Sequence, residues 1–250
     1  MNSLPWSGPD GAEAFDAVVA ATDRMLGYPF VLRELAGHLG TGGVLVDYGC
    51  GPGRVAGQAA RALGARVIGV DTSPEMLTLA RRTAPEVAEY HLVADGRVDA
   101  LPDGCADAVM CNHVLPSLPA EEVVLEVFAE IRRLLRPGGP VVLLTTDPAC
   151  TGLDYVSLRV TGGGAALAPG EPLTVRLLRT DGSWQEVPNH AWPPAVLPGL
   201  LERAGFRGPR QHRPTVAEAL PLADPALAAA HVWAAERAAP PLVVTTAFAG

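Results

Sequence analysis

The strongest constraint on the fold is the stretch 44–56, VLVDYGCGPGRVA, in which an apolar run breaks into alternating glycines. The apolar run predicts a buried strand, the glycines predict a tight turn, and the residues from Arg54 onward predict a helix. Gly49, Gly51 and Gly53 allow positive φ angles and a close approach of ligand to the loop amides, because glycine has no Cβ. Free N–H groups at the start of the helix suit a carboxylate or phosphate. The stretch therefore predicts a nucleotide-type binding turn, with a plain structural turn as the alternative.

Composition narrows the class of protein. The chain has 250 residues, 48% hydrophobic and 18% charged, so we expect a globular chain with a substantial core. Its formal net charge is −8 and it has no lysine, and an acidic chain without a basic tract argues against a nucleic-acid substrate. The four cysteines lack C-x-x-C spacing, which disfavours a disulfide framework or a structural zinc site. Short apolar runs and no signal-peptide pattern predict a cytoplasmic protein without a membrane span.

A second acid follows the glycine turn at the spacing of a nucleotide-binding βαβ unit. Residues 66–71 are mostly apolar and end in Asp71, about twenty residues beyond the turn, which would put this carboxylate beside the two hydroxyls of a ribose. Ser73 is expected to cap the next helix, with Pro74 at its first position. Asp71 is therefore the second fixed point of the predicted site.

Four motifs in order resemble those of class I S-adenosylmethionine-dependent methyltransferases. D-x-G-x-G-x-G from Asp47 resembles the first motif of that family, and D-x-S-x-x-M-L from Asp71 resembles the second. A-D-G…L-P from Ala94 resembles the third, and L-R-P-G-G-x-V-V-L from Leu135 again resembles the family. Dinucleotide-binding turns read G-x-G-x-x-G, whereas here the third glycine comes one residue early, which makes a nicotinamide-dependent oxidoreductase the weaker alternative. The resemblance spans roughly residues 40–148.

The resemblance implies how the cofactor is held. It implies that Asp47 lies close to the methionine ammonium, that the glycine loop passes under the methionine and ribose, and that Met76 lies against the adenine. It also implies that Asp95 accepts from the adenine amino group and that Tyr28 reaches the methionine carboxylate. The alternatives are a helix seam for Tyr28, a core position for Met76 and a surface turn for Asp95. The predicted cofactor contacts are Tyr28, Asp47, Gly49, Cys50, Gly51, Gly53, Asp71, Thr72, Met76, Asp95, Gly96 and Asn112.

The same resemblance implies an α/β fold, a Rossmann-like three-layer sandwich whose seven-stranded, mostly parallel sheet has an antiparallel last strand. Residues 1–40 are expected to form an N-terminal helical cap, with one helix over 12–26 and a second over 30–39. Residues 41–250 are expected to form the methyltransferase domain, with its third strand over 90–96. We expect no separable second domain.

Residues 149–192 interrupt the βα alternation and predict an inserted antiparallel flap over the crevice, with Asp181-Gly182 as a hairpin turn. We expect this flap to decide which substrate binds. Its aromatic residues would suit a flat or apolar small molecule, although they could equally join the flap to the domain. Its three arginines could bind an acidic group or lie on a solvated strand face. The predicted substrate contacts are Asp147, Tyr155, Trp184 and Trp192.

Two histidines are the predicted catalytic residues, because an imidazole can take the proton of a hydroxyl, phenol or amine near neutral pH. His190 stands between the flap and the next helix, and His113 follows the fourth strand. Asp147 is followed by Pro148, not by the asparagine typical of metal-dependent relatives, so no metal is expected. The sequence thus predicts methyl transfer from S-adenosylmethionine to an O or N atom of a small metabolite, in specialised metabolism. The alternative is a non-methylating cyclase or isomerase with the same cofactor pocket.

Overall fold

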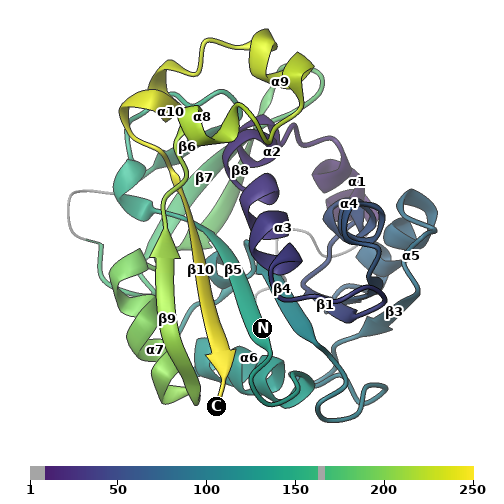
Figure 1. The fold of residues 1–250 in the computed structure, drawn as a ribbon. Coiled ribbons are helices and arrows are strands. Elements are labelled where there is room, and N and C mark those ends of the chain that lie inside the picture. Colours follow the sequence, from purple (N-terminus) through teal and green to yellow (C-terminus); the bar gives the residue numbers. More distant parts are fainter. Residues whose placement is uncertain (1–8, 163–166) are drawn as a thin grey trace.

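Seven strands form the main sheet of the computed structural model, which describes residues 9–162 and 167–250. They are β1 (Val44–Tyr48), β2 (Arg66–Asp71), β3 (Glu89–Leu92), β4 (Ala108–Asn112), β5 (Pro140–Thr146), β9 (Phe206–His212) and β10 (Leu242–Ala249). Their order is β3-β2-β1-β4-β5-β10-β9, and β10 runs antiparallel to both of its neighbours while the other pairs are parallel (Figure 1). This confirms the predicted sheet. The order reverses at β1, and in open α/β sheets ligands bind beside the carboxyl ends of strands at such a point.

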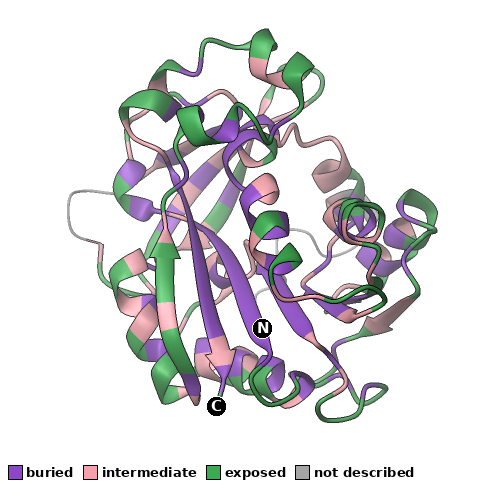
Figure 2. Ribbon diagram, in the orientation of Figure 1, coloured by how far each residue is buried: buried purple, intermediate pink, exposed green. Residues whose placement is uncertain are grey.

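Helices cover both faces of this sheet and the end at which its parallel strands terminate (Figure 1). They are α1 (Pro9–Asp16), α2 (Ala21–Leu26), α3 (Tyr28–Ala36), α4 (Arg54–Leu63), α5 (Pro74–Thr83), α6 (Glu121–Leu134), α7 (Leu197–Arg203), α8 (Val216–Ala219), α9 (Pro225–Ala230) and α10 (Ala234–Ala238). In β1, Leu45 packs on the side of α2, α3 and α4, whereas Val46 packs on the side of α6 and α7. Both sides of the central strands are therefore buried, which explains their continuous apolar runs (Figure 2). Among the helices in the described ranges, none is long and apolar enough to cross a membrane.

The N-terminal cap differs from the predicted single helix over 12–26. The chain forms α1 and α2, and the residues between them pair with the flap. Val19 N–H donates to the Leu178 carbonyl at 2.7 Å, and Thr180 N–H donates to the Ala17 carbonyl at 2.9 Å. These bonds to a distant strand replace helical ones, and the spacing of apolar residues gives no sign of them. The prediction of one continuous helix is therefore wrong, and the structure joins cap and flap.

The predicted flap is an antiparallel sheet of its own. It contains β6 (Leu158–Thr161), β7 (Pro172–Leu178) and β8 (Trp184–His190) in that order. A hairpin joins β7 to β8, and Gly182 in its turn has a φ of +82°. This confirms the turn predicted from Asp181-Gly182. Figure 1 shows the flap and α8–α10 at the same end of the main sheet, which is the end at which the parallel strands terminate.

A buried polar network connects the cap, the flap and the C-terminal helices. The Glu236 carboxylate in α10 accepts from the Thr22 hydroxyl at 3.1 Å and from the Val156 N–H at 2.8 Å. The Thr22 N–H donates to the Ser157 hydroxyl at 2.9 Å. Glu236 is 1% exposed, so this network is shielded from solvent. It holds together three segments that are far apart in the chain.

Candidate active site

The glycine turn follows the carboxyl end of β1 and leads into α4. Gly49, Gly51 and Gly53 have φ angles of +78°, +50° and +77°, in the left-handed region that favours glycine. The Gly51 N–H donates to the Asp71 carboxylate at 2.8 Å, which ties the turn to the end of β2. A Cβ added to Gly51 would lie 3.7 Å from the ring of Phe15, so α1 lies over the turn. The geometry of the predicted turn is confirmed.

Asp47 is a buried acid without a counter-charge. Its side chain is 2% exposed, and among the described residues no group forms a hydrogen bond or ion pair with its carboxylate. Burial, and after it the negative charge of Asp71, raises the pKa of Asp47 from 3.8 to about 8. Because a nearby cation favours the charged form of a carboxyl group, this position is suited to receive a positively charged ligand group.

Asp71 organises the loop between β2 and α5. Its carboxylate accepts from the Ser73 N–H at 2.9 Å as well as from Gly51, and burial raises its pKa. The Ser73 hydroxyl accepts from the Met76 N–H at 3.2 Å, which confirms the predicted helix cap. Thr72 between them is exposed, and Met76 is 3% exposed in the core beside the loop. Each carboxylate oxygen of Asp71 already accepts a hydrogen bond from a backbone N–H group. These bonds fix the orientation of the carboxylate to which a ribose would bind.

Asp95 lies beyond the end of the third strand and not within it. The predicted third strand is present as β3, but its predicted end at residue 96 is wrong, because β3 ends at Leu92 and Asp95 and Gly96 form an exposed turn. Their φ angles are +49° and +76°, and the N–H groups and carbonyls of Ala94 and Arg97 bond across the turn at 2.9 Å. Asp-Gly is typical of turns with two positive φ angles, and that local preference ends the strand. The adenine contact of Asp95 stays a prediction.

The residues that follow β4 contact α2 of the N-terminal cap. Asn112 ends the strand, and both polar atoms of its buried amide lack a hydrogen-bond partner in the described structure. His113 follows with a φ of +56°, and its Nε2 lies 2.7 Å from the Asp23 carboxylate of α2. Burial, then the charges of Asp23 and Asp47, hold the pKa of Tyr28 well above its usual range. These residues therefore come together around the glycine turn.

Comparison with known proteins shows to which protein family the chain belongs. Residues 46–143 match the model of a methyltransferase domain family. The chain is 33% identical over 208 residues to the N-demethylindolmycin N-methyltransferase of Streptomyces griseus, a match that covers 80% of this chain and 86% of the relative. This chain belongs to the class I S-adenosylmethionine-dependent methyltransferases. The CcbJ methyltransferase of Streptomyces caelestis has the same fold, with a TM-score of 0.66, 19% identity and full coverage of both chains. So does a methyltransferase of Aquifex aeolicus, with a TM-score of 0.60, 13% identity and coverage of 97% and 99%.

The residues around the turn fit the cofactor of this methyltransferase family. S-adenosylmethionine carries an ammonium, a sulfonium and a carboxylate, and the structure offers the uncompensated acid Asp47 and the unpaired amide of Asn112. The side chain of Cys50 is 6% exposed and its Sγ lies 3.7 Å from the Gly51 carbonyl, so it packs beneath the turn. Burial holds the pKa of the Cys50 thiol well above its usual range. Because this thiol stays neutral, Asp47 is the group beside the turn that can lose its proton when a cation binds.

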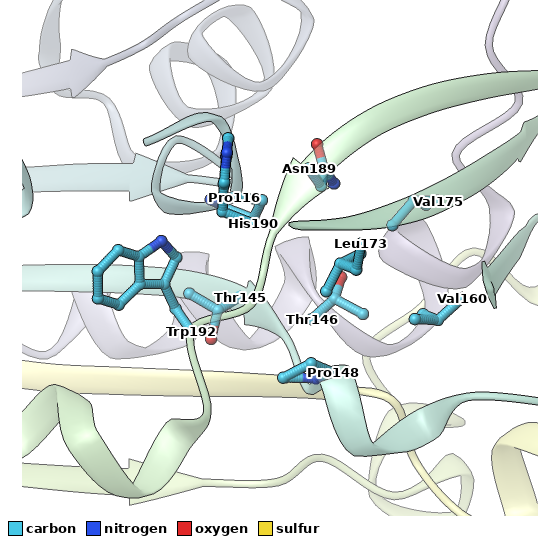
Figure 3. A pocket seen from close by; sticks show the side chains of 10 residues that line it. All are labelled: Pro116, Thr145, Thr146, Pro148, Val160, Leu173, Val175, Asn189, His190 and Trp192. Carbon is cyan, nitrogen blue, oxygen red and sulfur yellow. The ribbon is translucent and has the colours of Figure 1, made fainter. Parts of the chain in front are cut away.

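A hollow of this methyltransferase, with a cavity volume of about 20 Å³, lies between the end of β5 and the flap (Figure 3). Its lining side chains carry no formal charge apart from what His190 can acquire. Two of its polar atoms, Thr145 Oγ1 and His190 Nδ1, are buried and have no partner in the described residues. The lining residues are Pro116, Thr145, Thr146, Pro148, Val160, Leu173, Val175, Asn189, His190 and Trp192.

The predicted substrate contacts separate into two groups. Trp192 lies in this hollow, and its indole N–H donates to the Leu118 carbonyl at 3.0 Å. Tyr155 instead packs in the core of the flap, 2% exposed, and its hydroxyl donates to the Ala239 carbonyl at 2.8 Å. Trp184 packs under Arg159, whose guanidinium lies 4.1 Å from the ring centroid. For Tyr155 and Trp184 the structure thus favours the alternative, in which aromatic residues hold the flap together.

Both carboxylate oxygens of Asp147, the fourth predicted substrate contact, already bond to protein groups. One carboxylate oxygen accepts from the Ala149 N–H at 2.9 Å and caps the short helical turn 148–150, and the other pairs with Arg213. Sequence reasoning missed Thr145, whose only signal is a polar residue at the end of an apolar strand. It also missed the Asp23–His113 pair, because 90 positions separate the two residues and no motif connects them.

Proposed function

We propose that this enzyme transfers a methyl group from S-adenosylmethionine to a nitrogen atom of a small metabolite in specialised metabolism, with an oxygen acceptor as the second possibility. Nitrogen is supported by the 33% identical relative, which is named N-demethylindolmycin N-methyltransferase. The observation that carries the proposal is the hollow between β5 and the flap, because a mostly apolar lining with a few polar atoms suits a small molecule. Residues 41–250 are the proposed methyltransferase domain, and residues 1–40 the proposed cap.

The proposed cofactor contacts follow from the charge and pairing of the residues around the turn. Asp47 would face the ammonium, and the Asn112 amide would bond with the methionine part. Asp71 would accept from the ribose hydroxyls, and Met76 would lie against the adenine. Tyr28 keeps its proton and would donate to the methionine carboxylate. The cofactor supplies an electrophilic methyl group on a sulfonium, so these residues need only bind it and align it with the acceptor.

For proton transfer we favour His190 over His113. The Nδ1 atom of His190 has no partner in the described residues and lies at the hollow, so it is free to accept a proton from an acceptor there. The Nε2 atom of His113 is taken by Asp23. We propose that His113 instead positions the cap, because this contact joins α2 to the end of β4.

Incubation with S-adenosylmethionine and candidate acceptors is the experiment that tests methyl transfer. We expect a product heavier by one methylene unit and an equal amount of S-adenosylhomocysteine, both measured by mass spectrometry. Conversion of an acceptor without a mass gain and without S-adenosylhomocysteine would instead favour the cyclase or isomerase alternative. Calorimetry with NAD serves as the cofactor control, and we expect no binding.

We also expect methylation to survive treatment with a strong chelator. Metal-dependent methyl transfer needs several oxygen ligands, and both carboxylate oxygens of Asp147 are already engaged by Ala149 and Arg213. The measurement compares initial rates before and after removal of divalent cations. A loss of activity that magnesium restores would contradict this expectation.

A further inference from the structure

The lining of the hollow beneath the flap indicates the chemistry of its ligand. We propose that it takes an uncharged hydrogen-bonding group of the methyl acceptor, which Thr145 and His190 hold, so that the acceptor is neutral at this end. This inference rests on the proposed methyl transfer and names the substrate class for it. Three observations carry it, namely the unpaired polar atoms, the absence of charge, and the fixed aromatic wall.

The first observation concerns Thr145, which is 1% exposed at the end of β5. Its hydroxyl finds no hydrogen-bond partner in the described part of the chain, and neither does Nδ1 of His190. Buried polar groups are nearly always paired, and an unpaired one destabilises the fold. Both atoms line the same hollow, so a ligand group there would satisfy them. A hydroxyl and an imidazole can both donate or accept, which suits an amide, hydroxyl or amine on the acceptor.

The second observation concerns charge. Each of the three flap arginines is close to a carboxylate: Arg159 Nε lies 2.8 Å from Asp154, Arg176 Nε lies 2.9 Å from Glu186, and Arg179 Nε lies 3.8 Å from Asp181. Outside the flap, Arg213 pairs with Asp147 beside the hollow.

Because each flap arginine already lies beside a carboxylate of the protein, the hypothesis that these arginines bind an acidic group of the substrate is disfavoured. An acidic acceptor in the hollow would lose its hydration without gaining a free cation from the described residues. The charge pattern therefore favours a neutral acceptor.

The third observation concerns shape. Trp192 is 3% exposed, and the bond from its indole N–H to Leu118 fixes the orientation of the ring. Figure 3 shows Trp192, His190 and Pro116 on one side of the hollow and the aliphatic Val160 and Val175 of the flap on the other. The cavity between these apolar walls measures about 20 Å³, which leaves room for a small polar group of the acceptor and not for the whole molecule.

The test uses protein saturated with S-adenosylhomocysteine and two matched probes, indole-3-carboxamide and indole-3-carboxylate, which differ mainly in charge. Ligand-observed NMR titration measures both affinities. We expect the wild type to bind the carboxamide at least about tenfold more tightly than the carboxylate. We expect Thr145→Val to weaken carboxamide binding by about tenfold and to raise the Tm, because it removes an unpaired buried hydroxyl and keeps the side-chain shape.

Thr245→Val is the matched control. Thr245 is buried on the neighbouring strand β10, and its hydroxyl accepts from the Gln211 amide at 3.2 Å. The substitution removes this hydrogen bond, so we expect a lower Tm and unchanged affinity for the carboxamide. Asn189→Arg is the second variant, because it adds a cation to the lining, and we expect it to shift the preference toward the carboxylate by at least about fivefold.

The outcomes separate the two proposals. Equal or tighter binding of the carboxylate by the wild type, no binding of either probe at millimolar concentration, or unchanged carboxamide affinity in Thr145→Val would each overturn the assignment of a neutral acceptor to this hollow. All three leave the binding of S-adenosylhomocysteine intact. Should Thr145→Val not fold, a preference that does not move in Asn189→Arg overturns the assignment. A wild type that binds no S-adenosylhomocysteine would overturn the proposed methyl transfer itself.

Discussion

Replacing Asp47 by asparagine is expected to weaken the binding of S-adenosylmethionine by about a hundredfold and to stabilise the cofactor-free protein. The affinity falls because the only acid that we propose to face the ammonium is removed. The stability rises because Asp47 is 2% exposed and has no counter-charge among the described residues. Asparagine has nearly the same shape and no charge to bury. Isothermal calorimetry measures the first effect and thermal unfolding without cofactor measures the second.

The gain in stability has a defined dependence on pH. The pKa of Asp47 is raised in the folded state, from 3.8 to about 8, so the folded protein binds more protons than the unfolded chain between these two values. Its contribution therefore makes the wild type less stable as pH rises through this window, and the full cost is present above it. At about pH 4 we expect Asp47→Asn to leave the free energy of unfolding nearly unchanged. Above pH 8 we expect it to raise the free energy of unfolding by at least about 2 kcal/mol, which corresponds to a Tm rise of roughly 5 °C.

The same titration predicts a proton release when the cofactor binds. Near pH 7 the cofactor-free carboxyl holds its proton, and a cation beside it drives that proton off, so the affinity of the wild type should rise with pH up to about 8. Calorimetry in buffers of different ionisation enthalpy counts the protons. The control is Asp99→Asn, a carboxylate with an 85% exposed side chain, which should alter neither affinity nor stability. A cofactor affinity that Asp47→Asn leaves unchanged would contradict the assigned role.

Residue types and spacing predicted the glycine turn and the central strands well because local chemistry decides both, whereas the seven-stranded sheet was implied by the family resemblance. Positive φ angles at Gly49, Gly51 and Gly53 are a property of glycine itself, and the apolar runs of the central strands follow from burial on both faces. The cap of α5 at Ser73 is equally local. Such features need no knowledge of distant partners, so residue type and spacing are sufficient.

The predictions that were wrong or incomplete depend on contacts between segments far apart in the chain. The break between α1 and α2 exists because Val19 pairs with the flap, and the engagement of Asp147 depends on Arg213, 66 positions away. The alternating pattern in the flap predicted its strands, but it gave no indication that Tyr155 would bond to Ala239. What the sequence lacked was therefore the pairing of polar groups, and this pairing decides which side chains remain free for a ligand.

Replacing His190 by alanine is expected to lower the turnover number of methylation by about a hundredfold, with less than about a twofold change in the affinity for S-adenosylmethionine. The imidazole lies in the hollow, away from the glycine turn, and its Nδ1 is not committed to any partner in the described residues. Removal of a proton acceptor affects the chemical step, whereas we propose that cofactor binding depends on other residues, at the carboxyl ends of β1 and β2. Single-turnover kinetics and calorimetry measure the two quantities separately.

Two further variants separate proton transfer from packing. His190→Gln retains a hydrogen-bonding side chain that cannot take up a proton near neutral pH, so its rate should fall nearly as far as that of His190→Ala. His91→Ala removes a histidine that pairs with Glu89 on β3 at 2.8 Å, and it should leave the rate unchanged. An unchanged turnover number in His190→Ala would end the assignment of His190 as the base. If His190→Gln alone kept full activity, hydrogen bonding would suffice, and alignment of the acceptor with the methyl group would account for most of the catalysis.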